Sequence, residues 1–288
     1  MLRFAGLLRR AFWRALQHDA LNVAKGAAFS FILTFFPALM VLAAVLAMSP
    51  HTETIVKEIG EALGYILPPG TRSAARGFFE ARTRHPTGLL ISASLLTVFA
   101  ATGVMLSWME GFRKAYQLPR LWSFWKEQGI AFLLVGLCFL PMIAASLLVA
   151  FGSLVETWMV FNLQGASTYI FFFWTAVRLL ISVLTSIAVI TLVYHYAIPR
   201  TLPWHSVLPG AVLATVAWLL ATAAFGWYVK NYALYNVIYG SLGAAIALLV
   251  WMFIVCVIIL VGAEFNALVY PRPVERLQER TVTVRTQA

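Results

Sequence analysis

One arginine stands out among the residues whose chemistry could serve a function. Arg178 lies about nine residues inside an apolar block long enough to cross a bilayer, and the apolar blocks supply no carboxylate at a comparable depth. A charged side chain at that depth is costly. Two interpretations remain open: Arg178 faces a water-filled cavity that holds an anionic group such as a phosphate, or it is a structural charge that reaches Glu156 or the lipid headgroups.

A second polar group is expected at the end of the last apolar block. Glu264 and Asn266 fall near the depth at which Lys25 enters the first block. An ion pair between Lys25 and Glu264 is the simplest interpretation. A proton relay would need further acids along the same path, and the apolar blocks supply none.

A third candidate is a polar, glycine-containing corner between the last two apolar blocks. Tyrosines are common at the membrane interface, so their presence here is expected. The interface does not account for the asparagine or for the glycines at the start of the next helix. They could fix a re-entrant bend or present backbone donors to a ligand. The residues of this corner are Tyr235, Asn236, Tyr239, Gly240, Ser241 and Gly243.

The sequence gives little support for hydrolytic or metal-dependent chemistry. Metal-dependent hydrolysis needs clustered carboxylates or histidines, whereas the candidates are dispersed singly along the chain: Asp19, Glu110, Glu127, Glu264 and His205. Cys138 and Cys256 both fall inside apolar blocks, and no CxxC or HExxH pattern occurs. We therefore expect no metal, no cofactor and no enzymatic activity.

The elements that must position these residues are membrane-spanning helices. Hydrophobic residues make up 61% of the chain and charged residues 11%, against about 45–50% and 25% in soluble domains. The composition predicts an all-α polytopic fold in which residues 26–270 form six spans. They are 26–48, 88–109, 129–151, 169–197, 207–229 and 241–269. The fourth and sixth exceed the bilayer thickness and should tilt, kink or project, while Pro37 and Pro141 are possible kinks.

Three segments lie outside the spans. Residues 1–25 predict a basic amphipathic helix, which lies on the membrane surface or packs on the cytoplasmic face of the protein. Residues 52–84, between the first two spans, predict an outer-face helical hairpin that is broken at Pro68-Pro69-Gly70. Residues 271–288 predict a partly disordered tail.

Charge placement gives the orientation. The chain carries 21 Lys and Arg and a formal net charge of +10. Fourteen of these basic residues fall on the side of both termini and six on the other side, which predicts cytoplasmic N- and C-termini. Because the basic residues sit at span ends, we expect membrane lipids rather than nucleic acid as partners. The oligomeric state stays open.

Three stretches resemble the YihY/BrkB family of bacterial inner-membrane proteins. They are KGAAFSFILTFFP from Lys25, RTLPWHSVLPG from Arg200, and YNVIYGSLGAAIALLVWMFIVCVIILVGAEFNA from Tyr235. The Tyr-Gly-Ser-Leu-Gly and Gly-Ala-Glu-Asn features of the family correspond to Tyr239 through Gly243 and to Gly262, Ala263, Glu264 and Asn266. The sequence departs from the family where Lys25-Gly26 replaces the usual small apolar residues.

The resemblance implies six spans in a bacterial inner membrane. Members have been labelled ribonuclease BN, which is regarded as a misassignment, and virulence or serum-resistance factors. Combined with Arg178 and the kinked spans, it suggests a translocator or exporter of an amphiphilic or anionic, lipid-like solute. The alternative is a non-transporting scaffold or a virulence-associated envelope factor without catalysis.

Overall fold

The structure, a computed structural model, describes residues 2–47, 86–141, 167–199, 203–231 and 241–271. Those residues form seven helices and no strands, so the all-α fold is confirmed. Six are long and apolar enough to cross a membrane. The labelled helices are α1 (Leu2–Gln17), α2 (Ala20–Ala47), α5 (Pro86–Ala115), α7 (Ser167–Tyr196), α8 (Trp204–Asn231) and α10 (Ser241–Val269). The remaining helix, Phe124–Pro141, we call the third span.

The spans differ in length less than expected. Helices α2, α5, α7, α8 and α10 each contain 28 to 30 residues, or about 42–45 Å at a rise of about 1.5 Å per residue. All five therefore exceed a hydrocarbon core of about 30 Å, not only the fourth and sixth. The reason is that helices such as α5 continue through charged residues, to Ala115, after the apolar block has ended.

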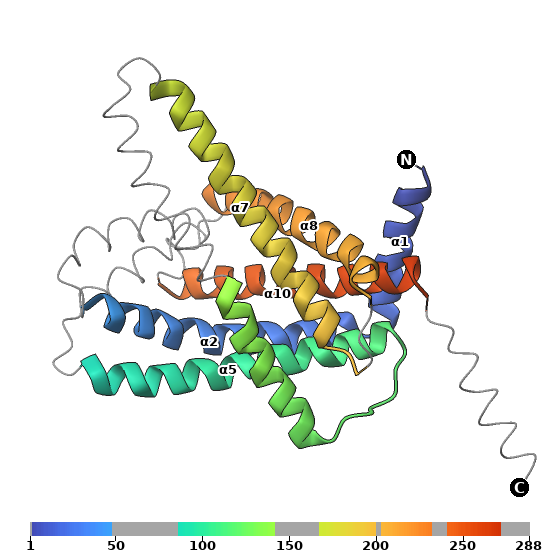
Figure 1. Cartoon of the computed structure of the whole chain (residues 1–288), viewed down its shortest axis with the longest axis horizontal. Coiled ribbons are helices and arrows are strands. Elements are labelled where there is room, and N and C mark those ends of the chain that lie inside the picture. The colour runs from blue at the N-terminus through green and yellow to red at the C-terminus, as the bar shows by residue number, and fades with distance from the viewer. Residues whose placement is uncertain (1, 48–85, 142–166, 200–202, 232–240, 272–288) are drawn as a thin grey trace, which may run out of the picture.

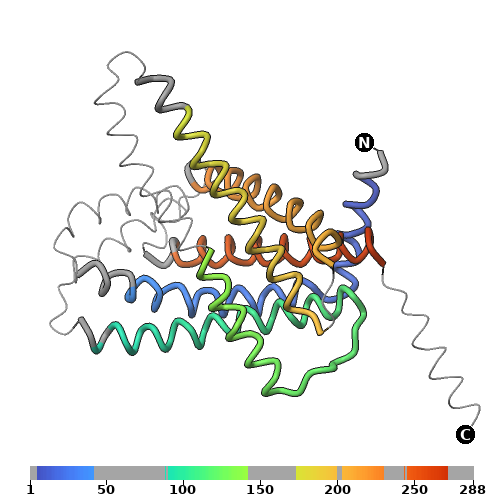
Figure 2. The backbone as a smooth tube through the Cα atoms, viewed as in Figure 1, coloured from blue at the N-terminus to red at the C-terminus, as the bar shows by residue number. Residues whose placement is uncertain are grey.

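The bundle has one end at which both described termini lie. Helices α2, α5 and α10 run alongside one another, and α8 packs on α10 (Figure 1). Helix α1 crosses the end of this group, next to the last turn of α10, and α7 and the third span are inclined to it (Figures 1 and 2). We call this the α1 end of the bundle.

Asp19 makes the sharp turn from α1 into α2. It adopts a left-handed φ of 64°, a conformation that Asp tolerates better than most residues. Its carboxylate accepts a hydrogen bond from the side-chain amide of Asn22 in the first turn of α2. The turn lets α1 cross the bundle end while α2 enters the bundle.

Small residues form the contact surfaces between the spans. On α2, the buried side chains include Ala20, Ala24, Ala27 and Ala28. A Cβ at Gly111 of α5 would collide with Leu260 of α10. Since lipid offers apolar side chains as good a solvent as the protein interior does, close packing of small residues is what brings such helices together.

The outward surfaces are strongly apolar. Phe99 of α5 is 75% exposed, and Leu95, Leu140 and Leu220 are also mostly exposed. A soluble monomer does not display apolar patches of this extent. The long apolar helices and these outward side chains together show an integral membrane protein.

Several expectations concern parts of the chain outside the described residues. They include the outer hairpin, 52–84, nearly all of the tail, and residues 142–151 of the third span. Helix α2 runs through Pro37 without interruption. Pro141 is the last described residue of the third span. The structure therefore leaves the predicted kink at Pro141 as a prediction.

Candidate functional site

Glu264 lies at the α1 end, on the last turns of α10, where its side chain is only 2% exposed. Its Oε1 lies 2.5 Å from Nδ1 of His18, which follows α1. The expected pairing with Lys25 is therefore corrected, because Lys25 is exposed and donates to Asn22 at 3.0 Å. The crossing of α1 over the bundle end is what brings His18, rather than Lys25, to Glu264.

Asn266 connects α10 to the beginning of α8 and is fully buried. Its Oδ1 accepts a hydrogen bond from the backbone N–H of Gly210 at 2.6 Å, and its Nδ2 donates to the carbonyl of Val207 at 2.9 Å. Both polar ends of the amide are thus satisfied away from water, as buried polar groups require. Asn266 holds α8 against α10.

Gly262 makes room for two neighbouring helices. A Cβ at this position would collide with the hydroxyl of Tyr194 on α7 and would crowd the carbonyl of Gly210 on α8. The buried Tyr194 hydroxyl donates to the carbonyl of Ile259 at 2.6 Å. The segment Gly262 to Asn266 is therefore the point at which α7, α8, α10 and the α1–α2 turn meet.

A charged cavity of about 350 Å³ opens at the same end. Its charged residues come from the last turns of α5, the connection that follows, and the start of the third span. They are Glu110, Arg113, Arg120 and Glu127. Trp122, Phe124, residues directly after α7, and Leu106, Ser107 and Met109 of α5 complete the lining.

The end of α5 determines where these side chains lie. Gln117 has a left-handed φ of 51°, the N–H of Leu118 donates to the carbonyl of Arg113 at 2.9 Å, and the N–H of Gln117 donates to that of Lys114 at 3.0 Å. These two bonds form a Schellman motif, which terminates a helix and reverses the chain. The reversal carries Arg120 back toward Arg113.

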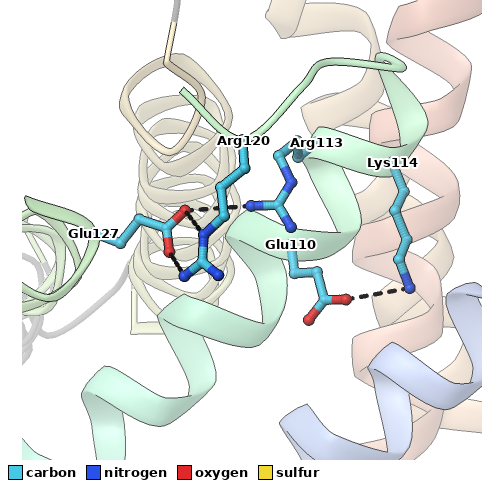
Figure 3. Close-up of polar contacts among 5 residues, drawn as sticks. All are labelled: Glu110, Arg113, Lys114, Arg120 and Glu127. Atoms are coloured by element: carbon cyan, nitrogen blue, oxygen red, sulfur yellow. Dashed lines mark hydrogen bonds and ion pairs between the residues drawn. The ribbon is translucent and has the colours of Figure 1, made fainter. Parts of the chain in front are cut away.

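Glu127 joins the two arginines (Figure 3). Arg120 contacts both carboxylate oxygens, at 3.3 and 2.5 Å, and Arg113 Nη1 lies 3.2 Å from Oε1. The hydrogen bond to Glu127, followed by the negative charge of Glu127, raises the pKa of Arg120 above its usual value. Bidentate arginine–carboxylate contacts combine strength with fixed geometry. Glu127 thus holds Arg113 and Arg120 in place.

Lys114 lies between two other carboxylates. Its Nζ is 3.2 Å from Glu110 and 3.4 Å from Asp19 at the α1–α2 turn. In Figure 3 the carboxylate of Glu110 points toward Lys114 and away from Glu127. All three side chains are at least one-third exposed, so these contacts add little stability. Of the three, Glu110 lines the cavity.

A second cavity, of about 330 Å³, has an entirely apolar lining surface. The residues around it belong to α2, α5, the third span, α7 and α10, and include Phe31, Met105, Cys138, Val193 and Ile259. On α5 the linings of the two cavities overlap along the helix, since Leu106 and Met109 line the charged cavity and Met105 and Trp108 the apolar one. On the third span, Glu127 lines the charged cavity and Val135 the apolar one, about 12 Å apart along the helix.

Arg178 lies on α7, beyond the apolar cavity as seen from the α1 end. It is partly buried and is absent from the linings of both cavities. Eleven residues separate it from Val189, which lines the apolar cavity. Eleven residues are close to three helical turns, so Arg178 and Val189 share a face of α7.

The polar corner is described only in part. Ser241 is the first residue of α10, and Gly243 is buried in its first turn. Tyr235, Asn236, Tyr239 and Gly240 lie outside the described residues. The corner stays a prediction.

The charged cavity was missed by sequence reasoning. Its arginines fall in a connection where basic residues are explained by membrane orientation, and its two glutamates appear isolated. In the sequence Glu110 and Glu127 flank Arg113 and Arg120, but this order does not by itself distinguish a cavity from charges that orient the helices. Among the described residues, no three His, Cys, Asp or Glu side chains gather closely enough to hold a metal ion.

A family of known proteins matches most of this chain. The family described as "Virulence factor BrkB" matches residues 11–285. The chain belongs to this family. Gly262, Glu264 and Asn266, which carry part of the resemblance seen in the sequence, are residues that join four segments of the structure.

Individual BrkB relatives have low sequence identity to this chain but match most of its length. A "putative ribonuclease-like protein YfkH" of Bacillus subtilis is 26% identical over 92% of this chain and 95% of the relative. A "UPF0761 membrane protein" of Tolumonas auensis is 24% identical over 89% of this chain and 83% of its own length. One of Chromohalobacter salexigens is 26% identical over 90% of this chain and 62% of its own length. No solved structure matches this chain.

Proposed function

We propose that this BrkB-family protein is a translocator or exporter of an amphiphilic, lipid-like solute in a bacterial inner membrane. The observation that carries the proposal is the pair of cavities of similar volume, one charged and one apolar. An amphiphile has a polar group that needs hydrogen-bond partners and a chain that prefers an apolar surrounding. The paired cavities offer both.

The spacing of the cavities suits one amphiphilic molecule. Val193 on α7 lines the apolar cavity, and Ala197, directly after α7, lines the charged one. The N–H of Ala197 donates to the carbonyl of Val193, so the two residues are one turn, or about 6 Å, apart. On the third span the corresponding separation is about 12 Å. Such distances are comparable to the separation of a lipid headgroup from the upper part of its acyl chains.

Arg178 extends this arrangement toward the other end of the bundle. It shares a face of α7 with Val189 and lies about 16 Å farther from the α1 end. An ionisable residue at depth in a span is by default a candidate for a functional site such as a transport path. A polar group leaving the charged cavity would thus meet a second cation along α7.

Flux measurements with purified protein test the proposal. The protein is reconstituted into liposomes that contain acyl-labelled fluorescent phospholipids, and dithionite quenching reports how fast each lipid changes leaflet. We expect faster exchange than in protein-free vesicles. Ala101→Phe, which fills the apolar cavity from α5, should slow it, whereas Leu95→Phe on the exposed face of the same helix should not.

Two results would contradict the proposal. Exchange equal to that of empty vesicles would favour the alternative, a non-transporting scaffold or virulence-associated envelope factor. Equal slowing by Ala101→Phe and Leu95→Phe would show that the apolar cavity has no special part. Arg178→Ala tests the arginine separately, because unchanged exchange in this variant would remove Arg178 from the path while leaving the cavities in place.

A further inference from the structure

The charges around the charged cavity fall into two groups of opposite net sign. Arg113, Arg120 and Glu127 carry one net positive charge. Lys114, Glu110 and Asp19 carry one net negative charge. The groups adjoin along the last turns of α5 (Figure 3). The cavity therefore presents a positive and a negative region side by side.

This pattern disfavours a purely anionic ligand. An anion near the arginines would also approach Glu110, whose charge is only half compensated because Lys114 is shared with Asp19. Like charges at short range oppose binding unless a cation lies between them. A ligand that carries its own cation next to its anion would satisfy both regions.

The donors and acceptors have capacity for such a ligand. The contact with Glu127 uses one N–H of Arg113, and a guanidinium offers five. On the other side, one oxygen of Glu110 contacts Lys114, whereas a carboxylate can accept several hydrogen bonds. Trp122 also lines the cavity, and indole faces attract ammonium groups.

We propose that the charged cavity binds the zwitterionic headgroup of an amine-bearing phospholipid, with its phosphate on Arg113 and Arg120 and its ammonium on Glu110. The inference rests on the proposed function in placing an acyl chain in the apolar cavity. Glu127 acts as a positioning residue, because its carboxylate holds Arg113 and Arg120 in place.

Lipid retention in native mass spectrometry tests the headgroup. Protein purified in detergent is offered an equal mixture of phosphatidylethanolamine and phosphatidylglycerol of the same acyl composition. We expect the wild type to retain more phosphatidylethanolamine. Glu110→Gln should lower the ratio of retained phosphatidylethanolamine to retained phosphatidylglycerol by about fivefold. The variant loses the charge-assisted hydrogen bond between Glu110 and the lipid ammonium, at a partly exposed site.

Asp19→Asn is the matched control. Asp19 and Glu110 contact the same lysine and are similarly exposed, at 52% and 50%, but Asp19 does not line the cavity. Each substitution removes one negative charge from the same group. If the lipid ammonium contacts Glu110 directly, the ratio of the two retained lipids changes in Glu110→Gln and not in Asp19→Asn. Equal changes in both variants would overturn that contact.

A soluble competitor distinguishes a lipid from a free headgroup. Glycerophosphoethanolamine has the same zwitterion without acyl chains, so it should displace the retained lipid at least about tenfold more weakly than short-chain phosphatidylethanolamine does, because it gains nothing from apolar burial. Equally strong displacement would overturn the assignment to a lipid.

The two proposals fail in different measurements. Equal retention of both lipids by the wild type would overturn the zwitterion site, even if flux in liposomes persisted. Selective retention that depends on Glu110, found together with flux equal to empty vesicles, would support the site and overturn translocation. Arg113→Gln should reduce retention of both phospholipids, and undiminished retention would remove the phosphate from the arginines.

Discussion

Asn266 and Glu264 are close in sequence on α10 and both buried, yet they have different structural partners. Asn266 bonds the backbone of α8, and Glu264 bonds His18 after α1. Because a buried amide or carboxylate must find partners within the protein, each fixes the position of a neighbouring segment. These residues define the geometry of the α1 end.

Replacing Asn266 by Ala should destabilise the protein by about 2–4 kcal/mol, because the N–H of Gly210 and the carbonyl of Val207 would lose a buried partner. The measurement is the apparent unfolding temperature in detergent. Gln17→Ala, at an exposed position, is the control and should cost less than about 0.5 kcal/mol. Similar losses in the two variants would show that the Asn266 bonds contribute little.

Sequence reasoning singled out both residues at this scale but not their contacts. A carboxylate at the end of a span requires a partner, and Lys25 has a suitable depth. Depth along a helix axis does not determine which way a side chain points. His18 was outside the expected span and became the partner through the turn at Asp19.

At the scale of elements, α8 and α10 approach closely where Gly210 faces Gly262. A Cβ at Gly210 would meet the carbonyl of Gly262 and lie 2.5 Å from Asn266. Backbone cannot move aside as a flexible side chain can. The contact therefore depends on glycine at this position.

Two glycines of α8 provide a matched pair of substitutions. Gly210→Ala should lower stability by at least about 2 kcal/mol, through overpacking of the α8–α10 contact. Gly226→Ala has open space around its Cβ and should be neutral or stabilising by up to about 1 kcal/mol, since alanine is the better helix former. Thermal unfolding of both variants checks this, and equal destabilisation would contradict the proposed close approach.

Helix α1 is held to the bundle in part by His18. His18→Ala would leave the buried carboxylate of Glu264 without its partner, so local opening of α1 should become more frequent. We expect hydrogen exchange of α1 amides to accelerate about tenfold, which corresponds to about 1.4 kcal/mol. His205→Ala, at an exposed position near Tyr270, should leave α1 exchange unchanged.

The elements themselves were largely predictable. Long apolar blocks determine six spans, since an open backbone cannot cross lipid. The boundaries were less predictable, because hydropathy ends where charged residues begin and the helices do not. Helix α5 continues to Ala115 until the turn at Gln117 ends it, and this continuation creates one wall of the charged cavity.

On the scale of the whole molecule, the central question is which side of the membrane the α1 end faces. Positive residues predict the cytoplasm. Both cysteines, Cys138 and Cys256, are buried and should not react with polar reagents, so single introduced cysteines can report the orientation.

Gln17→Cys at the α1 end and Gly88→Cys at the start of α5 are both at exposed positions. In intact cells, a membrane-impermeant maleimide should label Gly88→Cys and spare Gln17→Cys until the cells are lysed. The reverse pattern would place the α1 end outside. Labelling of neither variant after lysis would show that these positions are not accessible as described.

The family and the number of spans were predictable because they depend on local pattern. The charged cavity was not, because it depends on how the α5 end, the following connection and the third span converge. No local pattern distinguishes a charge that orients a helix from one that borders a cavity. The two roles can be told apart only in the folded structure, where Arg120 contacts Glu127.

The contact between His18 and Glu264 has a consequence for biosynthesis. The two residues are 246 positions apart in the chain, so α1 leaves the ribosome long before its partner is translated. During that interval its apolar side chains have no docking surface on α10 and must be accommodated by the membrane surface or by a chaperone. The contact between His18 and Glu264 can therefore form only after the last span has been inserted.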